Sequence, residues 1–219
     1  MNKFFIQKLI RQHTKLTRNH LTPELCLRLI TPDCLLWNAS PDRSPFDDPF
    51  WAFFWPGGQV LTRYILDNPK LFYKTTVLDV GSGCGSTALA AKLVGASRVV
   101  ANDIDPVAEV AIEINMEANA LQVTTDTSNR LSSSLDEQFD FILIGDMFYD
   151  PLFTDLIATW LQRHKNASVL IGDPGRYSFK NHPIQKQLEH VAEYVLPRTC
   201  QIENNGLTTG NIWLLKNDR

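Results

Sequence analysis

Short apolar runs alternate along the chain with longer amphipathic stretches, a pattern typical of strands and helices in an α/β protein. Four runs have the length and aliphatic content of buried parallel strands, and glycine or aspartate follows each within two residues. These runs are Val77–Val80, Val99–Ala101, Phe139–Ile144 and Ser168–Ile171. A weaker run, Gln122–Thr125, is expected to be the third strand of the series.

Helical patterns fill the segments between these runs. They predict helices over Gln59–Leu66, from Pro106 onward, over residues 151–163 and over about Ile184–Glu193. Pro106 and Pro151 each follow an aspartate, and an aspartate before proline at the first helical position is a typical helix start.

The periodicity also predicts which helix faces are buried. The helix after Pro106 is expected to bury an apolar stripe formed by Val107, Val110, Ala111 and Ile114. Its acids recur every four residues and are expected to face solvent; they are Glu109, Glu113 and Glu117. The helix over residues 151–163 is expected to turn four side chains inward, namely Leu152, Leu156, Thr159 and Trp160.

The chain is expected to end in two extended runs joined without a helix, Tyr194–Ile202 and Asn211–Leu215, which suits an antiparallel edge pair. The predicted fold class is therefore α/β, with a three-layer, seven-strand Rossmann-like sheet that is mostly parallel and ends in an antiparallel β-hairpin. Residues 51–219 are expected to form this domain, and residues 1–50 a helical and loop extension packed on it.

Composition limits the possible functions. A chain of 219 residues with 44% hydrophobic residues and a net charge of −3 suits one globular domain, and that charge gives no general basic field for nucleic acid. No apolar run approaches the roughly 18 residues of a membrane span. The four cysteines are scattered, and no histidine lies at ligand spacing, so no metal site is expected.

The first twenty residues are basic and contain no acid. Such a segment resembles a mitochondrial presequence, but it lacks serine and has few arginines, which favours a terminal helix packed on the domain. It has no secretory cleavage site.

The stretch from Val77 to Asp105 has the outline of a nucleotide-binding βαβ unit: strand, glycine turn, helix, strand and carboxylate. Its glycines, Gly81, Gly83 and Gly85, are spaced G-x-G-x-G, whereas a dinucleotide fingerprint is spaced G-x-G-x-x-G. Asp79 before the turn is placed to hold an ammonium group or the loop itself, and Asp103 can accept both hydroxyls of a ribose. This combination resembles motif I of the seven-strand, class I S-adenosylmethionine-dependent methyltransferases.

Two other segments are candidates for the cofactor site. Trp55 ends an aromatic-rich run before Pro56-Gly57-Gly58, and its rigid ring can lie against adenine or a methionine chain. Asn129 follows the third strand, where an adenine edge would lie in a doubly wound sheet.

The residues after the fourth strand are candidates for catalysis, because ligands of open α/β sheets bind beyond the carboxyl ends of the strands. Asp146 can capture and orient a cationic amine, and Tyr149 can wall an aliphatic substrate arm. The alternative that Asp146 caps the next helix is weaker, since Asp150 directly precedes Pro151.

Several runs together resemble the lysine methyltransferases of the electron transfer flavoprotein β-subunit: DPFWAFFWPGGQ, VLDVGSGCG, ANDIDP, GDMFYD, IGDPGR and GLTT. The resemblance covers nearly everything from Leu21 to Trp213. It implies S-adenosylmethionine as cofactor, that flavoprotein subunit as protein partner, and Asp146 facing the lysine. It also implies a cofactor lining formed by Trp55, Gly81, Gly83, Asp103, Asn129 and Gly145.

Animal members of this family are mitochondrial, but here the resemblance begins almost at the first methionine. A bacterial, cytoplasmic protein is therefore expected, or a protein of the mitochondrial matrix if the source is eukaryotic. The protein is also expected to be a monomer. Two alternatives stay open: an N-methyltransferase of another acceptor, such as ribosomal protein L11 or nicotinamide, and a cofactor-binding module without catalysis.

Overall fold

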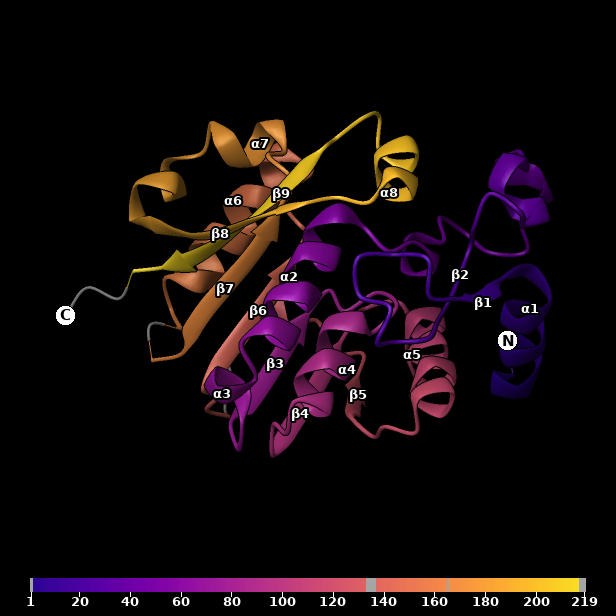
Figure 1. Ribbon diagram of the computed structural model, residues 1–219, viewed down its shortest axis with the longest axis horizontal. Helices are drawn as coiled ribbons and strands as arrows, with labels where there is room; N and C mark the ends of the chain where they lie inside the picture. Colours follow the sequence, from indigo (N-terminus) through magenta and orange to yellow (C-terminus); the bar gives the residue numbers. More distant parts are fainter. Residues whose placement is uncertain (1, 133–136, 165, 217–219) are drawn as a thin grey trace.

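The computed structural model of the protein describes residues 2–132, 137–164 and 166–216, and a seven-stranded sheet runs through it (Figure 1). The strand order is β5-β4-β3-β6-β7-β9-β8, in which the first five are parallel and β9 is antiparallel to both neighbours. The strands are β3 Thr76–Val80, β4 Arg98–Asn102, β5 Thr124–Asp126, β6 Phe141–Gly145, β7 Ser168–Asp173, β8 Leu188–Val195 and β9 Thr209–Leu215. The predicted fold class is confirmed.

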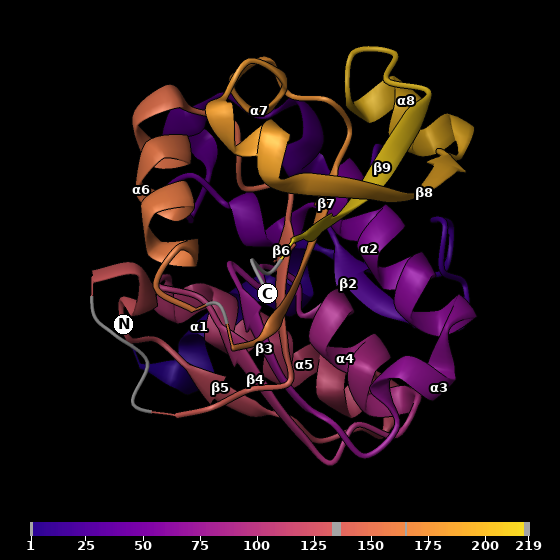
Figure 2. The same cartoon turned by 90° about the vertical axis from the view of Figure 1, so that its left-hand side faces the viewer.

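Helices cover both faces of this sheet (Figure 2). The α-helices are α1 Lys3–His13, α2 Pro56–Asp67, α3 Pro69–Phe72, α4 Ser86–Leu93, α5 Pro106–Asn119, α6 Pro151–Leu161, α7 Tyr177–Lys180 and α8 Arg198–Glu203. Residues of α2, α4 and α5 share one core cluster with the sheet, and residues of α6 and α7 share the cluster on the opposite face. Short 3-10 turns lie at Leu35–Asn38, Pro41–Arg43, Phe50–Ala52, Arg130–Ser132 and Pro183–Gln187.

The central strand β3 shows how its sequence divides between the two cores. Val77 packs with the α2 and α4 side, while Leu78 and Val80 pack with the α6 side, because successive side chains of a strand point to opposite faces. Asp79 therefore lies on the same face as Val77, where α4 begins. The helix α4 can come close to the sheet there because its buried residues are mostly small.

Two helix starts match the predicted capping. Asp105 accepts a hydrogen bond from the backbone N–H of Val107 at 2.7 Å, and Asp150 accepts one from that of Phe153 at 3.0 Å. The face predicted for α6 was partly wrong: Trp160 is buried, but Leu152, Leu156 and Thr159 are exposed. Asp150 fixes where the helix begins, and from that start the side chains that face the core are those of Thr154, Ile157, Ala158 and Leu161.

The prediction for the C-terminal region was wrong in two respects. The residues assigned to a helix over Ile184–Glu193 form a 3-10 turn followed by β8, because the backbone of β8 pairs with β9 from Leu188 to Val195. The extended run expected over Tyr194–Ile202 ends at Val195, and α8 lies between the two strands. Pro197 cannot donate to a strand ladder and instead precedes the first turn of α8.

Other differences are small. The helix α2 begins at Pro56 rather than Gln59, and β5 spans Thr124–Asp126 rather than Gln122–Thr125. The division of the chain at residue 50 stays a prediction, and residues 217–219 of the expected domain lie outside the described ranges.

The basic N-terminal segment contains α1, which contacts α5. Lys3 Nζ lies 2.6 Å from Glu113, and Arg11 Nη2 lies 2.6 Å from Glu117. Two acids that were expected to face solvent therefore pair with this helix, while Thr125 donates a hydrogen bond to Glu109. A small two-stranded sheet, β1 Lys15–Thr17 with β2 Leu27–Leu29, follows α1.

Replacing Ile10 by alanine is expected to destabilise the whole protein by about 2–4 kcal/mol, because this α1 side chain is fully buried against the domain. Urea unfolding followed by circular dichroism measures the change. Phe4→Ala, on the same helix but 76% exposed, is the matched control and is expected to cost less than about 0.5 kcal/mol. Equal effects of the two substitutions would contradict the docking of α1.

Candidate functional site

The turn after β3 is built from glycines in the left-handed region of backbone space. Gly81, Gly83 and Gly85 have φ values of 67°, 54° and 80°. A Cβ at Gly83 would meet no described atom nearer than 3.8 Å, so bare main chain is accessible there. At Gly81 the methionine side chain of Met147 fills the space, and its sulfur would lie 2.2 Å from an added Cβ. The turn thus offers bare main chain beside one flexible thioether.

Asp79 is committed to holding this turn. Its Oδ2 accepts hydrogen bonds from Ser82 Oγ at 2.5 Å and from the backbone N–H of Ala88 at 3.1 Å. Burial, with a smaller contribution from the negative charge of Asp103, raises the pKa of Asp79 to about 7, although both hydrogen bonds oppose the shift. Of the two roles predicted for Asp79, the geometry therefore matches the one of holding the loop.

Asp103 follows β4 and contacts the same turn from the neighbouring strand. Its carboxylate accepts hydrogen bonds from the backbone N–H groups of Gly83 at 2.8 Å and Asp105 at 3.1 Å. Burial raises the pKa of Asp103, while these two donors lower it. Each oxygen accepts one of these bonds and keeps a lone pair, so this carboxylate can still accept hydroxyl donors such as those of a ribose.

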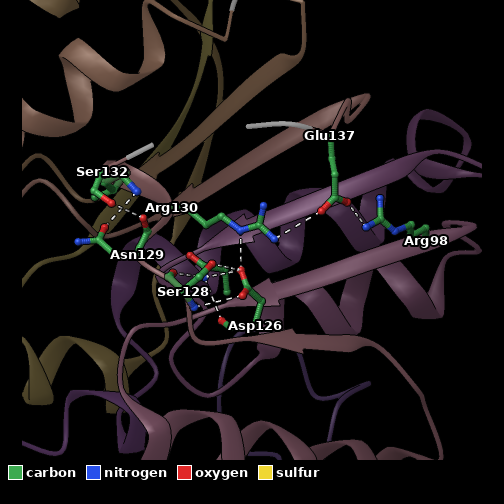
Figure 3. Close-up of polar contacts among 9 residues, drawn as sticks. Arg98, Asp126, Ser128, Asn129, Arg130, Ser132 and Glu137 are labelled. Carbon is green, nitrogen blue, oxygen red and sulfur yellow. Dashed lines mark hydrogen bonds and ion pairs between the residues drawn. The ribbon is translucent and has the colours of Figure 1, made fainter. Parts of the chain in front are cut away.

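The loop after β5 is organised by Asp126 rather than by Asn129 (Figure 3). Asp126 accepts hydrogen bonds from Asn102 Nδ2 at 3.0 Å and from Arg130 Nε at 2.5 Å. Burial opposes ionisation of Asp126, but the hydrogen bonds from Arg130 and Ser128 and the charge of Arg130 hold its pKa below the usual range. Asn129 is exposed, and its side-chain oxygen accepts from the backbone N–H of Leu131. Sequence reasoning missed Asp126, although its place at the end of β5 could have indicated it.

Trp55 lies immediately before α2 in a small aromatic group. Its indole N–H donates to the carbonyl of Phe50 at 2.9 Å, and its ring centroid is 5.6 Å from that of Phe53. The ring is half-buried and therefore keeps part of its surface accessible.

Asp146, the residue directly after β6, is buried, and its carboxylate accepts hydrogen bonds from two donors. Its Oδ2 accepts from the backbone N–H of Gly57 at 2.8 Å, and its Oδ1 accepts from Arg176 Nε at 2.6 Å. It does not cap α6, so the alternative role weighed for it is excluded. Its own φ is 59°, an uncommon left-handed value for a residue other than glycine.

The strained backbone of Asp146 coincides with a very close approach of α2 to the strand ends. A Cβ at Gly57 would lie 2.2 Å from the carbonyl oxygen of Gly172, and one at Gly145 would lie 3.0 Å from Gly58 Cα. Glycines of α2, β6 and β7 therefore allow direct main-chain contact, and sequence reasoning did not anticipate this role for Gly57 and Gly172.

Tyr149 is 63% exposed, and its ring centroid lies 5.4 Å from that of Phe153. Partial burial raises the pKa of Tyr149, and the charges of Asp150 and Asp103 add to this shift. Because Tyr149 lies within electrostatic range of Asp103 and Met147 lies against Gly81, the segment from residue 146 to residue 149 borders the glycine turn.

This sheet, with an open glycine turn after β3 and a carboxylate after β4, defines a class I S-adenosylmethionine-dependent methyltransferase. The family model described as ribosomal protein L11 methyltransferase (PrmA) matches residues 61–172. A relative named electron transfer flavoprotein beta subunit lysine methyltransferase, from Mus musculus, is 47% identical over 93% of this chain and 82% of its own. The chain belongs to the family of these lysine methyltransferases.

Solved structures agree on the fold. A ribosomal protein L11 methylase from Lactobacillus delbrueckii subsp. bulgaricus has a TM-score of 0.53 at 22% identity, covering 71% of this chain and 77% of that one. The N-methyltransferase NodS from Bradyrhizobium japonicum, solved with S-adenosyl-L-homocysteine, has a TM-score of 0.52 at 15% identity, covering 80% and 94%. Within the described residues, no helix has the length and apolar character that crossing a membrane requires.

Replacing Gly57 by alanine is expected to destabilise the protein by about 3 kcal/mol, because the new methyl group would collide with the carbonyl of Gly172. The midpoint of urea unfolding measures this change. Gly58→Ala is the matched control in the same helix: its Cβ would lie 3.7 Å from Phe54, so it is expected to be neutral or slightly stabilising. A well-tolerated Gly57→Ala would contradict the close approach of α2.

Proposed function

We propose that this enzyme transfers methyl groups from S-adenosylmethionine to lysine side chains of the electron transfer flavoprotein beta subunit. The choice of acceptor is supported by the 47% identity, over 93% of the chain, to a relative whose name states that substrate. The choice of an amine acceptor is supported by the buried carboxylate of Asp146, whose sequence neighbour Met147 lies against Gly81 of the glycine turn.

The proposed cofactor site is the turn after β3 together with the ends of its neighbouring strands. S-adenosylmethionine supplies an electrophilic methyl group on a sulfonium sulfur. The turn formed by Gly81, Gly83 and Gly85 receives the methionine part, with open main chain at Gly83 and the Met147 side chain displaced at Gly81. Asp79 fixes the turn, and Asp103 accepts the ribose hydroxyls. The remaining lining residues in this proposal are Trp55, Asn129 and Gly145.

In the proposed acceptor site, the amine enters between the glycine turn and the segment that follows β6. Asp146 binds the amine and aims its nitrogen at the methyl carbon, since methyl transfer depends mainly on positioning in line. Tyr149 walls the aliphatic arm of the lysine, consistent with a ring that is largely exposed beside the site.

We also propose that α1 remains in the mature enzyme and that the enzyme acts as a monomer. The ion pairs of α1 with Glu113 and Glu117 support its retention. The proposed location is the cytoplasm for a bacterial source, or the mitochondrial matrix for a eukaryotic one. Size-exclusion chromatography with light scattering tests the oligomeric state, and a dimer would contradict the proposal.

The substrate is tested by incubating the purified enzyme with radiolabelled S-adenosylmethionine and the isolated flavoprotein beta subunit. Label is expected on lysines of that subunit, which mass spectrometry then locates. Ribosomal protein L11 and nicotinamide serve as parallel acceptors. Label on either of these, with none on the flavoprotein subunit, would overturn the acceptor assignment, and binding of cofactor without label anywhere would indicate a non-catalytic module.

Asp103→Ala is expected to weaken binding of S-adenosylmethionine by roughly 10- to 100-fold, because hydrogen bonds to a charged acceptor are lost. Isothermal titration calorimetry measures the dissociation constant. Asp140→Ala is the control: Asp140 lies just before β6, at the opposite end of the sheet, and bonds Thr76. An unchanged affinity in Asp103→Ala would exclude the ribose role.

Asp146→Asn is expected to lower methyl transfer by roughly 100-fold or more while leaving cofactor affinity largely unchanged, because the amide keeps the shape but loses the charge that attracts an ammonium group. Rates with the flavoprotein subunit and calorimetry with the cofactor provide the two readouts. A parallel loss of cofactor binding would instead assign Asp146 to the cofactor pocket.

A further inference from the structure

Two buried carboxyl groups leave the ends of neighbouring parallel strands near the proposed acceptor site. Gly145 of β6 is in register with Gly172 of β7, so Asp146 and Asp173 follow at adjacent strand ends. Both are shielded from solvent, with exposed fractions of 6% and 0%. Two carboxylates this close repel each other, and the pair needs a compensating cation or a proton.

Arg176 is the cation beside this pair, and its side chain bonds only one of the two acids. Its Nε donates to Asp146 Oδ1 at 2.6 Å, whereas Asp173 Oδ1 accepts only backbone N–H groups, from Gly175 at 2.6 Å and Arg176 at 2.8 Å. Asp173 Oδ2 is buried and accepts no hydrogen bond from any residue that the structure describes. Burying a hydrogen-bond acceptor without a donor costs folding free energy. Such an oxygen is therefore a position where a donor from a substrate can bind.

The surroundings of Asp173 let its carboxyl group exchange a proton near neutrality. Burial, followed by the negative charge of Asp146, raises the pKa of Asp173 to about 7, against the two backbone donors and Arg176. On α8, burial raises the pKa of the Cys200 thiol to about 12, so it stays neutral, and burial also raises the pKa of Glu203. Opposite Asp173 on β9 lies the uncharged Asn211, which is hydrogen-bonded to His190.

We propose that Asp173 is the proton acceptor of the methyl-transfer reaction, acting through its unpartnered Oδ2, and that Arg176 covers the two carboxylates until the acceptor amine enters. This inference rests on the proposed function, because it requires an ammonium substrate at Asp146. Arg176 lies outside Asp146, since 26% of the Arg176 side-chain surface is exposed against 1% of the Asp146 side-chain surface.

The step balances without any further reactant. The N–H bond of the lysine ammonium group breaks, and its proton forms an O–H bond with Asp173 Oδ2. The electron pair left on nitrogen attacks the methyl carbon, the carbon–sulfur bond breaks, and its electrons convert the sulfonium to a thioether. Asp146 holds the Gly57 N–H, Arg176 and the incoming ammonium group, whereas Asp173 Oδ2 accepts no hydrogen bond from the described part of the chain and is therefore the oxygen that receives the proton; Arg176 stays protonated throughout.

The test is the pH dependence of kcat/KM for methylation of the flavoprotein beta subunit by Asp173→Asn. The wild-type enzyme is expected to gain activity up to about pH 7 and then level off, following the carboxyl group. The variant is expected to be roughly 100-fold slower at pH 7. Its activity should keep rising toward the lysine pKa of about 10, because only amine that is already neutral reacts.

Arg176→Gln provides a second readout that does not depend on Asp173→Asn folding. Loss of the nearby positive charge is expected to shift the wild-type rise in activity upward by roughly one pH unit. Asp140→Asn, remote from the site, is the control and should follow the wild-type profile. Cofactor affinity of each variant is measured by calorimetry, and it should stay close to that of the wild type.

The outcomes separate the two proposals. A wild-type enzyme that labels no lysine at any pH would overturn the proposed function. An active wild type with an Asp173→Asn profile parallel to its own, or an Arg176→Gln profile without a shift, would overturn the role of Asp173 alone. High-pH recovery of Asp173→Asn supports the inference, since a purely structural defect would not be restored by deprotonating the substrate.

Discussion

The site depends on the contact between the first turn of α2 and the ends of β6 and β7. Because Gly57 has no side chain, its backbone reaches Gly172, and its N–H binds the carboxylate of Asp146. Gly57 lies in the first turn of α2, where backbone N–H groups have no partner within the helix. The negative charge of Asp146 satisfies one of them and also interacts favourably with the helix dipole. The same contact fixes the place where the aromatic segment ending at Trp55 meets the strand ends.

The two buried acids with the highest carboxyl pKa values in the described structure differ in what surrounds them. Burial raises the pKa of both Asp79 and Asp173 to about 7. The donors to Asp79 come from its own turn and the start of α4, so its charge serves local structure. Asp173 has an unpartnered oxygen and two charged neighbours, Asp146 and Arg176. A raised pKa alone therefore does not distinguish a structural acid from a reactive one; the hydrogen-bond partners do.

The sequence predicted those features of the site that depend on neighbouring residues. The glycine turn, the position of the acid after β4 and the cap at Asp150 are local patterns, and the structure has them where the sequence predicted them. The partners of Asp146 were not predictable, because Gly57 and Arg176 lie 89 and 30 positions away in sequence. The apolar spacing in Leu188–Val195 is compatible with a helix, and only pairing with β9 makes this segment a strand.

The contacts of the N-terminal segment were likewise not predictable from neighbouring residues. A basic, acid-free amphipathic sequence is compatible with a targeting peptide or a structural helix, and only the absence of serine and the few arginines in it favour the helix. The partners of α1 lie more than 100 positions away, where Glu113 and Glu117 of α5 pair with Lys3 and Arg11. Such exposed pairs contribute little energy, whereas the buried Ile10 contributes much more. Apolar burial therefore contributes most of the stabilisation of α1 on the domain, and the exposed ion pairs add little.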